Sequence, residues 1–232
     1  MVSAWATQNQ LVLGQQKVDD KSNEITAIPK LLMQLNITGA VVTIDAMGRQ
    51  TKVAAKIIAQ GADYMLSLKG NQGKLHKDVK QFFESENTCP AAGYESYDGC
   101  HGRIETRTVR ATAAIDWLQE RHPHWVGIKS IVAVTAKREI KDKTTDETRY
   151  FISSIDTSDP KRLGQVVSAH WGIENNLHWV LDYAFDEDSQ RARLGNSAAN
   201  MTVIRYIALN LIKSEKNREG RGKKQTPQGF VK

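Results

Sequence analysis

Cysteine is scarce in this chain of 232 residues, which contains only Cys89 and Cys100. Two cysteines cannot form a disulfide framework, and one pair supplies too few thiolates for a structural zinc site. No apolar run approaches the roughly 20 residues that span a bilayer. Residues 1–9 also lack the basic start and apolar centre of a signal peptide. These absences predict a reduced, cytoplasmic protein with no membrane partner.

Several familiar nucleotide-binding and redox motifs are also missing. The sequence contains no P-loop, no GxGxxG motif, no CxxC pair and no internal repeat. Lysine and arginine exceed aspartate and glutamate, which gives a formal net charge of +6 and a sequence pI of about 9.2. This mildly basic balance permits a polyanionic partner such as DNA but does not demand one.

The first half of the chain has the pattern of a hairpin followed by a helix. Residues 2–6 and 11–18 alternate as two strands around a polar turn. Residues 24–35 then favour a helix. Pro29 lies inside that span, so an alternative start near Ile28 would place the proline in the first turn.

Two short apolar segments, residues 40–46 and 64–68, predict buried parallel strands. The helical segment 51–60 between them completes a βαβ unit. Ligand sites in such sheets lie beyond the carboxyl ends of the strands, where Asp45 and Lys69 stand. The simpler interpretations are a turn aspartate and an exposed loop lysine.

The middle of the chain changes character and predicts an antiparallel β insertion. Residues 103–111, 128–140 and 148–155 read as strands, whereas residues 89–102 are rich in turn formers. Basic residues in this part could line a nucleic-acid groove or form a solvated sheet face; they are Arg103, Arg107, Arg110, Lys129, Lys137, Arg138 and Lys141.

Residues 170–188, HWGIENNLHWVLDYAFDED, predict an amphipathic helix that carries metal-capable side chains. The apolar arc consists of Ile173, Leu177, Val180, Leu181 and Ala184. His170, Glu174, His178 and Asp182 recur at every fourth position and should stack along one side. Glu174 would then be half-shielded where the helix meets the protein body. From this stretch alone, a solvated helix face is the simpler interpretation.

A last helix is predicted over residues 196–213, followed by a basic tail without periodicity. Met201, Ile204, Ala208 and Leu211 form its expected buried stripe. The predicted organisation is a core over residues 1–86, the β insertion over 87–157, helices that complete the core over 158–213, and a tail over 214–232.

An aspartate at the end of a parallel strand and a glutamate on a late helix suit two-metal phosphoryl transfer. Two Mg²⁺ ions about 4 Å apart need carboxylates that converge from different elements. A zinc hydrolase that uses His170, Glu174 and His178 is an alternative, because zinc favours imidazole ligands. Zinc analysis of the purified protein would separate the two.

Long motifs in the correct order resemble the ISAs-type insertion-sequence transposases, also called H-repeat-associated proteins. These motifs are KVDDKSNEITAIPKLL, VVTIDAMG, DYMLSLKGNQGKLHKDV, RYFISSI and HWGIENNLHWVLDYAFDEDSQRAR. The resemblance implies an α/β fold with a ribonuclease-H-like core, a mixed sheet with flanking helices, interrupted by an antiparallel β insertion. It also implies two Mg²⁺ (or Mn²⁺) ions, the inverted-repeat ends of the element and target DNA as partners, and a homo-oligomer as a further expectation.

The resemblance assigns roles to particular residues. Asp45 corresponds to the second catalytic, metal-binding carboxylate and Glu174 to the third. Neighbours that would contact DNA or support the site are Lys69, Asn71, Gln72, His170, Trp171, Asn175, His178 and Asp182. In transposases with a Y-R-E-K signature, an arginine precedes the glutamate by four residues and a lysine follows it by seven. Here His170 and Leu181 stand at those places, so neither receives such a role.

The front of the chain departs from the family pattern. The first catalytic aspartate of the family lies in an IDGK-type strand upstream of the VSAW segment, where this chain begins. That strand would occupy the centre of a sheet with order 3-2-1-4-5. We therefore expect a truncated copy, poorly active or inactive alone; Glu24 is an auxiliary carboxylate only by analogy. A non-catalytic DNA-binding remnant is the other interpretation.

Overall fold

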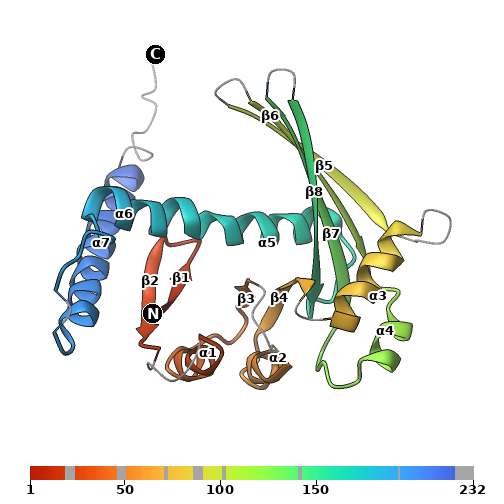
Figure 1. Cartoon of the computed structure of the whole chain (residues 1–232), viewed down its shortest axis with the longest axis horizontal. Coiled ribbons are helices and arrows are strands. Elements are labelled where there is room, and N and C mark those ends of the chain that lie inside the picture. Colours follow the sequence, from red (N-terminus) through yellow and green to blue (C-terminus); the bar gives the residue numbers. More distant parts are fainter. Residues whose placement is uncertain are drawn as a thin grey trace, which may run out of the picture. The chain divides into compact units, whose positions relative to one another are not determined.

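The computed structural model describes residues 1–18, 24–45, 51–70, 73–85, 91–100, 103–140, 143–192 and 194–222. The fold is a mixed α/β arrangement, in which a six-stranded sheet is flanked by helices and a separate two-stranded sheet stands at the start of the chain (Figure 1). No described helix is both long and apolar enough to span a bilayer.

The chain opens with the predicted hairpin. Strand β1 (Val2–Ala6) pairs antiparallel with β2 (Leu11–Gln16). Helix α1 (Glu24–Met33) follows and contains Pro29 in its interior, so the alternative start near Ile28 is wrong. Proline removes one backbone hydrogen bond from the helix. Burial of the apolar neighbours Ile28 and Leu31 offsets that loss.

The βαβ unit is confirmed in its parallel pairing. Strand β3 (Val41–Ile44) lies parallel to β4 (Asp63–Leu68), with Val41 opposite Asp63 and Ile44 opposite Leu66. Helix α2 (Thr51–Ala59) connects them. Gly61 lies just after the end of α2 and has a φ of +71°. Glycine adopts this left-handed conformation without steric cost because it has no Cβ atom. The carboxyl ends of β3 and β4 therefore lie at the same edge of the sheet.

The β insertion extends the core sheet. After α3 (Gly73–Glu84), the strands β5 (Ala92–Cys100), β6 (Arg103–Thr112), β7 (Ser130–Ile140) and β8 (Lys143–Ser153) form antiparallel pairs, with α4 (Asp116–Arg121) between β6 and β7. Strand β8 also pairs with β4, which gives the order β3-β4-β8-β7-β6-β5. The turn-rich segment 89–102 is thus largely a strand, because its backbone groups pair with β6 despite its glycines.

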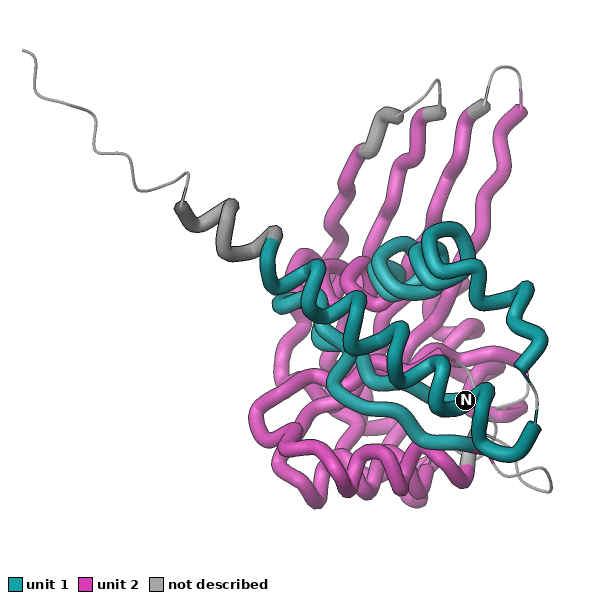
Figure 2. The backbone as a smooth tube through the Cα atoms, turned by 90° about the vertical axis from the view of Figure 1, so that its left-hand side faces the viewer, with its two compact units in different colours: residues 1–17, 171–232 teal, residues 18–170 magenta. Residues whose placement is uncertain are grey.

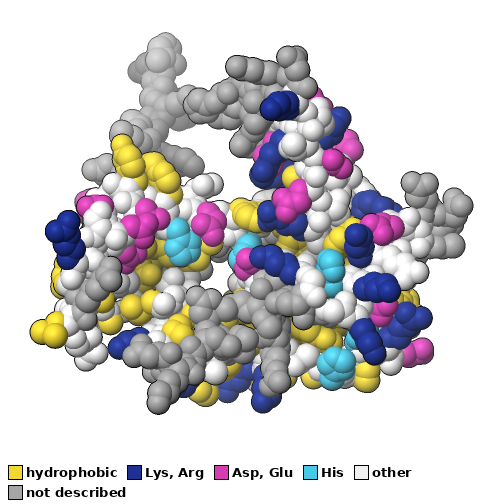
Figure 3. All heavy atoms as spheres, in the orientation of Figure 1, with side chains coloured by type: hydrophobic (Ala, Val, Ile, Leu, Met, Phe, Trp, Pro, Cys, Tyr) yellow, Lys and Arg dark blue, Asp and Glu magenta, His cyan; other side chains and the backbone are white. Residues whose placement is uncertain are grey.

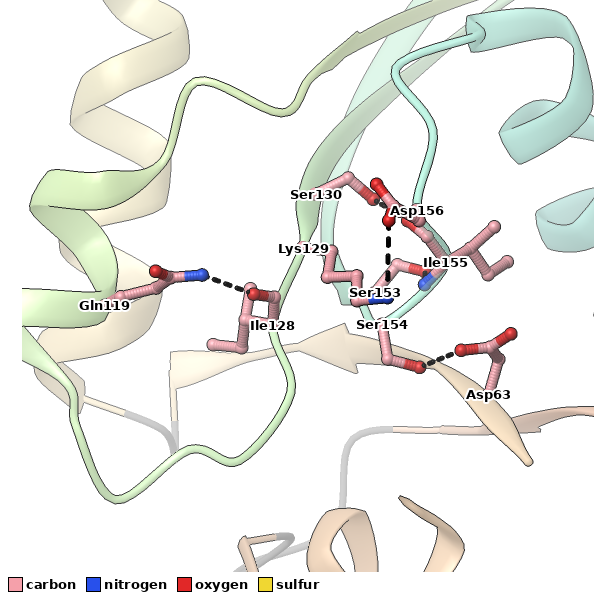
Figure 4. A network of polar contacts seen from close by, with 9 residues as sticks. All are labelled: Asp63, Gln119, Ile128, Lys129, Ser130, Ser153, Ser154, Ile155 and Asp156. Atoms are coloured by element: carbon pink, nitrogen blue, oxygen red, sulfur yellow. Dashed lines mark hydrogen bonds and ion pairs between the residues drawn. The ribbon is translucent and has the colours of Figure 1, made fainter. Parts of the chain in front are cut away.

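Serine hydroxyls fasten the end of β8 to the start of β4 (Figure 4). The hydroxyl of Ser154 donates to Asp63 Oδ1 at 2.8 Å and accepts from the Tyr64 N–H at 2.8 Å. Ser153 donates to the Tyr64 carbonyl at 2.9 Å. Ser153 and Ser154 are buried, so these bonds satisfy groups that water cannot reach. These hydrogen bonds fix the register of β4 against β8. They thereby set the position of the carboxyl end of β4.

Helix α5 (Pro160–Ile173) covers one face of the six-stranded sheet. Its Leu163 and Val167 share a buried cluster with strand residues that include Met65, Val132 and Phe151. Tyr150 and Ile152 point to the opposite face, because side chains alternate along a strand. Phe83 of α3 stacks on Tyr150 there, with ring centroids 6.2 Å apart. Near α3 and α5 the sheet is therefore packed on both faces.

The chain divides into two compact units, coloured separately in Figure 2. Unit 1 comprises residues 1–17 and 171–232, and unit 2 comprises residues 18–170. Unit 1 contains the hairpin, a π-turn (Glu174–His178), α6 (Trp179–Phe185) and α7 (Ser197–Gly222). Its core joins Val12, Leu177, Leu181 and Leu209. Helix α7 continues beyond Lys213, where the sequence predicted its end.

The predicted buried stripe of the last helix is wrong. Met201, Ile204 and Leu211 are exposed, whereas Arg205 and Leu209 are buried. Polar contacts select this face: the Asn210 amide accepts from the Val12 N–H and donates to the Val12 carbonyl, both at 2.8 Å. An apolar spacing pattern could not have predicted that bond.

Candidate active site

Asp45 and Lys69 meet where the two parallel strands end. Asp45 follows β3 and Lys69 follows β4, and the Lys69 ammonium donates to Asp45 Oδ2 at 2.9 Å. The two side chains are 61% and 58% exposed. An ion pair this exposed contributes less than about 1 kcal/mol. Asp45 is therefore oriented toward Lys69 but can exchange that cation for another.

His170, near the end of α5, reaches the same edge of unit 2. Its Nδ1 lies 3.0 Å from the Thr43 hydroxyl, and Thr43 precedes Asp45 by two residues on β3. Thr43 also pairs with Met65, which contacts α5 from the face of β4. The structure thus pairs Asp45 with Lys69, and it pairs His170 with Thr43 of the strand that precedes Asp45. Of these, His170 has a partner, Thr43, that the sequence did not suggest.

Glu174 begins a π-turn in unit 1. Residues Glu174–His178 are π-helical, and the Trp179 N–H donates to the Glu174 carbonyl five residues back. A π-turn inserts one extra residue into the helical repeat, and such turns occur frequently at functional sites. The predicted alignment of Glu174 with His178 and Asp182 at every fourth position is therefore interrupted.

Asn176 stabilises this turn. Its Nδ2 donates to the Gly172 carbonyl at 2.8 Å. In a regular α-helix that carbonyl would accept from the backbone N–H of Asn176. The side chain thus supplies a donor where the backbone pattern changes, which is a role that sequence inspection missed.

The remaining predicted site residues have separate outcomes. Glu174 is exposed rather than half-shielded, because the helix buries Leu177 and Leu181 instead. Four more residues of the signature are also exposed; they are Trp171, Asn175, His178 and Asp182. Ala184, expected in the apolar arc, is exposed as well. Asn71 and Gln72 lie outside the described residues, as does the side chain of Glu24.

The carboxylates of Asp45 and Glu174 are suitable ligands for a hard cation, but they belong to different units. Carboxylate oxygens such as those of Asp45 and Glu174 are ligands that Mg²⁺ prefers. Asp45 belongs to unit 2 and Glu174 to unit 1, and each is described within its own unit. Within the described part of the chain, no three or more His, Cys, Asp or Glu residues form a group that could hold a metal. The zinc alternative built on His170, Glu174 and His178 gains no support from this arrangement.

Of the basic side chains that the sequence singles out in the β insertion, those described each bind a neighbouring group, whereas Lys141 and the side chain of Arg103 lie outside the described residues. Arg107 and Arg138 both bind Glu105, Lys137 binds Glu139, and Lys129 binds Asp156. Arg110 donates to the Phe83 carbonyl at 2.9 Å. On the face drawn in Figure 3, basic and acidic side chains alternate over the strands. This agrees with the solvated sheet face that the sequence left as the second interpretation.

A shallow cavity of about 400 Å³ lies in unit 2 between α5 and strands β5–β7. Its lining includes Tyr94, Arg107, Gln165 and Ser168. None of the predicted catalytic residues lines it, so we do not assign the chemistry to this cavity.

The sequence interpretation also missed an exposed aromatic pair. Trp179 and Tyr183 in α6 stack with ring centroids 4.9 Å apart and an interplanar angle of 9°. Their spacing of four residues is the signal that could have revealed them, since such residues are neighbours on a helix.

These features define a mixed α/β domain with an acidic and a basic side chain at the ends of adjacent parallel strands. The family model that matches is the transposase DDE domain, over residues 1–211. The chain therefore belongs to the DDE transposase family.

Relatives with similar sequences carry related names. The chain is 41% identical to "Putative transposase YncI" of Escherichia coli O157:H7, over 95% of this chain and 57% of that protein. It is 39% identical to "H repeat-associated putative transposase YhhI" of Escherichia coli K12, over 93% of this chain and 58% of that protein. The chain thus spans less than two thirds of these relatives. No solved structure matches it significantly.

Proposed function

We propose that this chain carries part of a DDE transposase active site, which cuts and joins DNA strands at the ends of an insertion element. Asp45 and Glu174 are the metal-binding carboxylates in this proposal. The observation that carries it is the Asp45–Lys69 pair at the carboxyl ends of two adjacent parallel strands, in a chain of this family. That edge of an α/β sheet is where such folds bind their ligands.

Each residue has a defined task. Asp45 and Glu174 would hold Mg²⁺ (or Mn²⁺), and two such ions would supply activation of a water or 3′-hydroxyl and stabilisation of the leaving oxygen. Lys69 would exchange Asp45 for a DNA phosphate. The low strength of the exposed Asp45–Lys69 pair makes this exchange inexpensive. His170 steadies β3 through Thr43.

A DDE site requires a third carboxylate, whose position this proposal leaves open. Among the described strands, β3 pairs only with β4, and β1 only with β2. Each therefore has an edge on which a further strand can pair, as in a ribonuclease-H-like sheet.

Metal binding and strand transfer test the assignment together. We expect Mn²⁺ affinity to fall roughly ten-fold in Asp45→Asn and in Glu174→Gln, the loss typical of a weakened metal site. Asp156→Asn is the matched control, because Asp156 is an exposed aspartate that pairs with a lysine. Unchanged Mn²⁺ binding in both site variants would overturn the metal assignment.

Strand transfer on DNA that carries the element ends, with Mg²⁺ or Mn²⁺, provides the second readout. We expect Asp45→Ala to abolish whatever strand transfer the unmutated chain shows. Activity that survives Asp45→Ala would overturn the active-site assignment. If strand transfer is absent but DNA affinity falls steeply with salt, the chain acts as a DNA-binding remnant.

A further inference from the structure

The outer edge of β5 is open among the described strands. Strand β5 ends the order of the six-stranded sheet and pairs only with β6 (Figure 1). Its nine residues pair with β6 without a register shift, and none of them is lysine or proline. Lysine, proline and bulges are the usual features that keep a further strand from pairing with an edge. The backbone N–H and C=O groups along this edge therefore suit an extended peptide.

The shallow cavity of about 400 Å³ in unit 2 reaches this edge strand. Its apolar lining includes Val109, Val134 and Ala169, which come from two strands and from α5. Its polar lining carries hydroxyl, amide and guanidinium groups; these residues are Tyr94, Ser96, Arg107, Gln165 and Ser168. An apolar lining with a few polar groups that fix orientation is typical of ligand sites.

Arg107 brings a positive charge to the cavity that its partner does not fully neutralise. It donates to Glu105 Oε1 from Nε at 2.7 Å and from Nη2 at 2.6 Å. Arg138 shares the same carboxylate at 3.2 Å, so two guanidinium groups face one carboxylate. The next carboxylate near Arg138, that of Glu147, is already paired with Arg149. Arg107 Nη1 can therefore donate a charge-assisted hydrogen bond to a carboxylate ligand.

The register of β5 and β6 leaves a route from the open edge to Arg107. Ser96 is directly opposite Arg107, and both side chains line the cavity on the α5 side of the sheet. A strand added to the edge of β5 would lie two strand spacings, about 10 Å, from the backbone of Arg107. Because the Ser96 side chain is small, a glutamate on the added strand can extend over it to the guanidinium.

We propose that the β5 edge and the cavity together bind an extended, glutamate-containing segment of a partner protein. The segment adds a strand to β5 through backbone hydrogen bonds, and its glutamate enters the cavity and binds Arg107. A strand edge presents carbonyl oxygens as well as N–H groups, so it is complementary to a peptide and not to a phosphate backbone. The site uses neither Asp45 nor Lys69, and the inference does not depend on the proposed function.

Fluorescence polarisation of a labelled peptide tests the site in the full chain. The probe has one central glutamate with a valine two residues away on each side and threonine elsewhere, so that the glutamate and the valines share one face. We expect saturable binding of this probe. A matched probe with glutamine in place of glutamate should bind roughly ten-fold more weakly, because it lacks the charge-assisted bond to Arg107. A glutamate probe with N-methylated backbone donors should not bind.

Two variants of the chain separate recognition from folding. Ser96→Ile puts a β-branched side chain, which strands accommodate, over the route to Arg107 and should weaken binding of the glutamate probe roughly ten-fold. Arg107→Gln removes the cation and should abolish the preference for the glutamate probe over the glutamine probe. Tyr97→Ile is the matched control, because Tyr97 is exposed on the opposite face of the same strand; it should change binding less than about two-fold.

Several results would overturn the inference. They are failure of the glutamate probe to bind, equal binding of the glutamate and glutamine probes, or binding that Ser96→Ile leaves unchanged. A single-stranded oligonucleotide that displaces the probe, and that Ser96→Ile no longer binds, would show that the cavity takes nucleic acid instead. A loss of self-association by Ser96→Ile in sedimentation would show that the edge pairs with a second copy of the chain, which also overturns the inference.

Discussion

Glu105 is the buried charge whose partners are most clearly defined in the β insertion. Its side chain is 3% exposed, and it binds Arg107 at 2.6 Å and Arg138 at 3.2 Å. Burial by itself raises the pKa of Glu105, but hydrogen bonds and charges from Arg107 and Arg138 outweigh burial and lower that pKa below its usual value. Glu105 and Arg138 are opposite each other in the register of β6 and β7, so the pair also fixes that register.

Glu105→Gln should therefore lower the free energy of unfolding by about 1–3 kcal/mol at neutral pH, because the bonds to the arginines lose their charge. A carboxyl whose folded pKa is lowered stabilises the fold fully above its unfolded pKa of about 4.3. That contribution is lost as pH falls through the lowered folded pKa. Urea unfolding of both proteins from pH 7 downward should show the difference shrinking below about pH 4. A difference that stays constant with pH would contradict the assignment.

The sequence correctly predicted the position of a residue where the order of strands and helices alone determines that position. Asp45 and Lys69 were expected at the carboxyl ends of parallel strands, and the structure places them there, in contact. The partners Thr43 and Asn176 could not be predicted. Their bonds depend on where α5 crosses β3 and on the local change from α- to π-helix, and neither is encoded in spacing alone.

At the scale of elements, one glycine sets how closely α5 approaches the sheet. A Cβ added at Gly164 would meet Val109 Cγ2 at 2.8 Å, which is closer than side chains pack. Val109 belongs to the cluster that α5 covers. The distance between helix and sheet thus depends on the absence of a side chain at this position.

Gly164→Ala should lower the free energy of unfolding by up to about 2 kcal/mol, since an overpacking cost of about 1–3 kcal/mol is offset by a gain of about 1 kcal/mol in helix propensity. In a Val109→Ala background the clash is removed, and the same substitution should become neutral or stabilising. A double-mutant cycle by chemical denaturation measures this coupling. Equal effects in both backgrounds would show that the contact does not limit the packing.

Element prediction from sequence worked best for strongly periodic segments. The hairpin and the βαβ unit appear with ends shifted by a few residues, whereas α7 extends past its predicted end and the predicted 170–188 helix is divided by the π-turn. Strand β5 was missed because its segment carries turn-forming residues, whereas its pairing with β6 and the packing of Tyr94 on the buried cluster are long-range contacts. The π-turn was missed because apolar spacing cannot reveal where one extra residue is inserted.

At the scale of the whole molecule, the two units differ in how completely they bury apolar side chains. Most of the exposed large apolar residues among those described belong to unit 1, although it is the smaller unit. They include the α7 residues Met201, Val203, Ile204, Ile207, Leu211 and Ile212. Contiguous exposed apolar surface of this kind usually marks an interaction site or an association hazard.

We expect the chain to self-associate as its concentration rises, and Ile204→Glu with Leu211→Glu to reduce this association. Charged side chains on an apolar face must lose water when a second copy packs against it. Analytical ultracentrifugation over a concentration series measures the effect, with Met33→Glu in unit 2 as a control at an equally exposed apolar position. A chain that stays monomeric throughout would refute the expectation.

The overall organisation was only partly predictable. The sequence predicted a separate β insertion, but β8 pairs with β4, so core and insertion share one sheet. Which distant strands pair depends on long-range register, and no local pattern in residues 143–153 specifies β4 as the neighbour. The family resemblance gave the overall class, and its assignment of Asp45 and Glu174 stays a prediction. The division of the chain into two units could not be read from that resemblance.

The π-turn has a consequence for the length of the chain at this point. The π-turn contains one residue more than the same stretch of regular α-helix. The Asn176 side chain donates to the Gly172 carbonyl, which loses its usual backbone donor there. Removal of Asn175 would turn the segment into an ordinary α-helix, while Leu181 and Trp179 keep their present directions. By contrast, one residue inserted a turn away, where the helix is regular, would rotate the buried Leu177 and Leu181 toward solvent. Chains of this kind can therefore differ by one residue at Asn175 without disturbing the helix on either side.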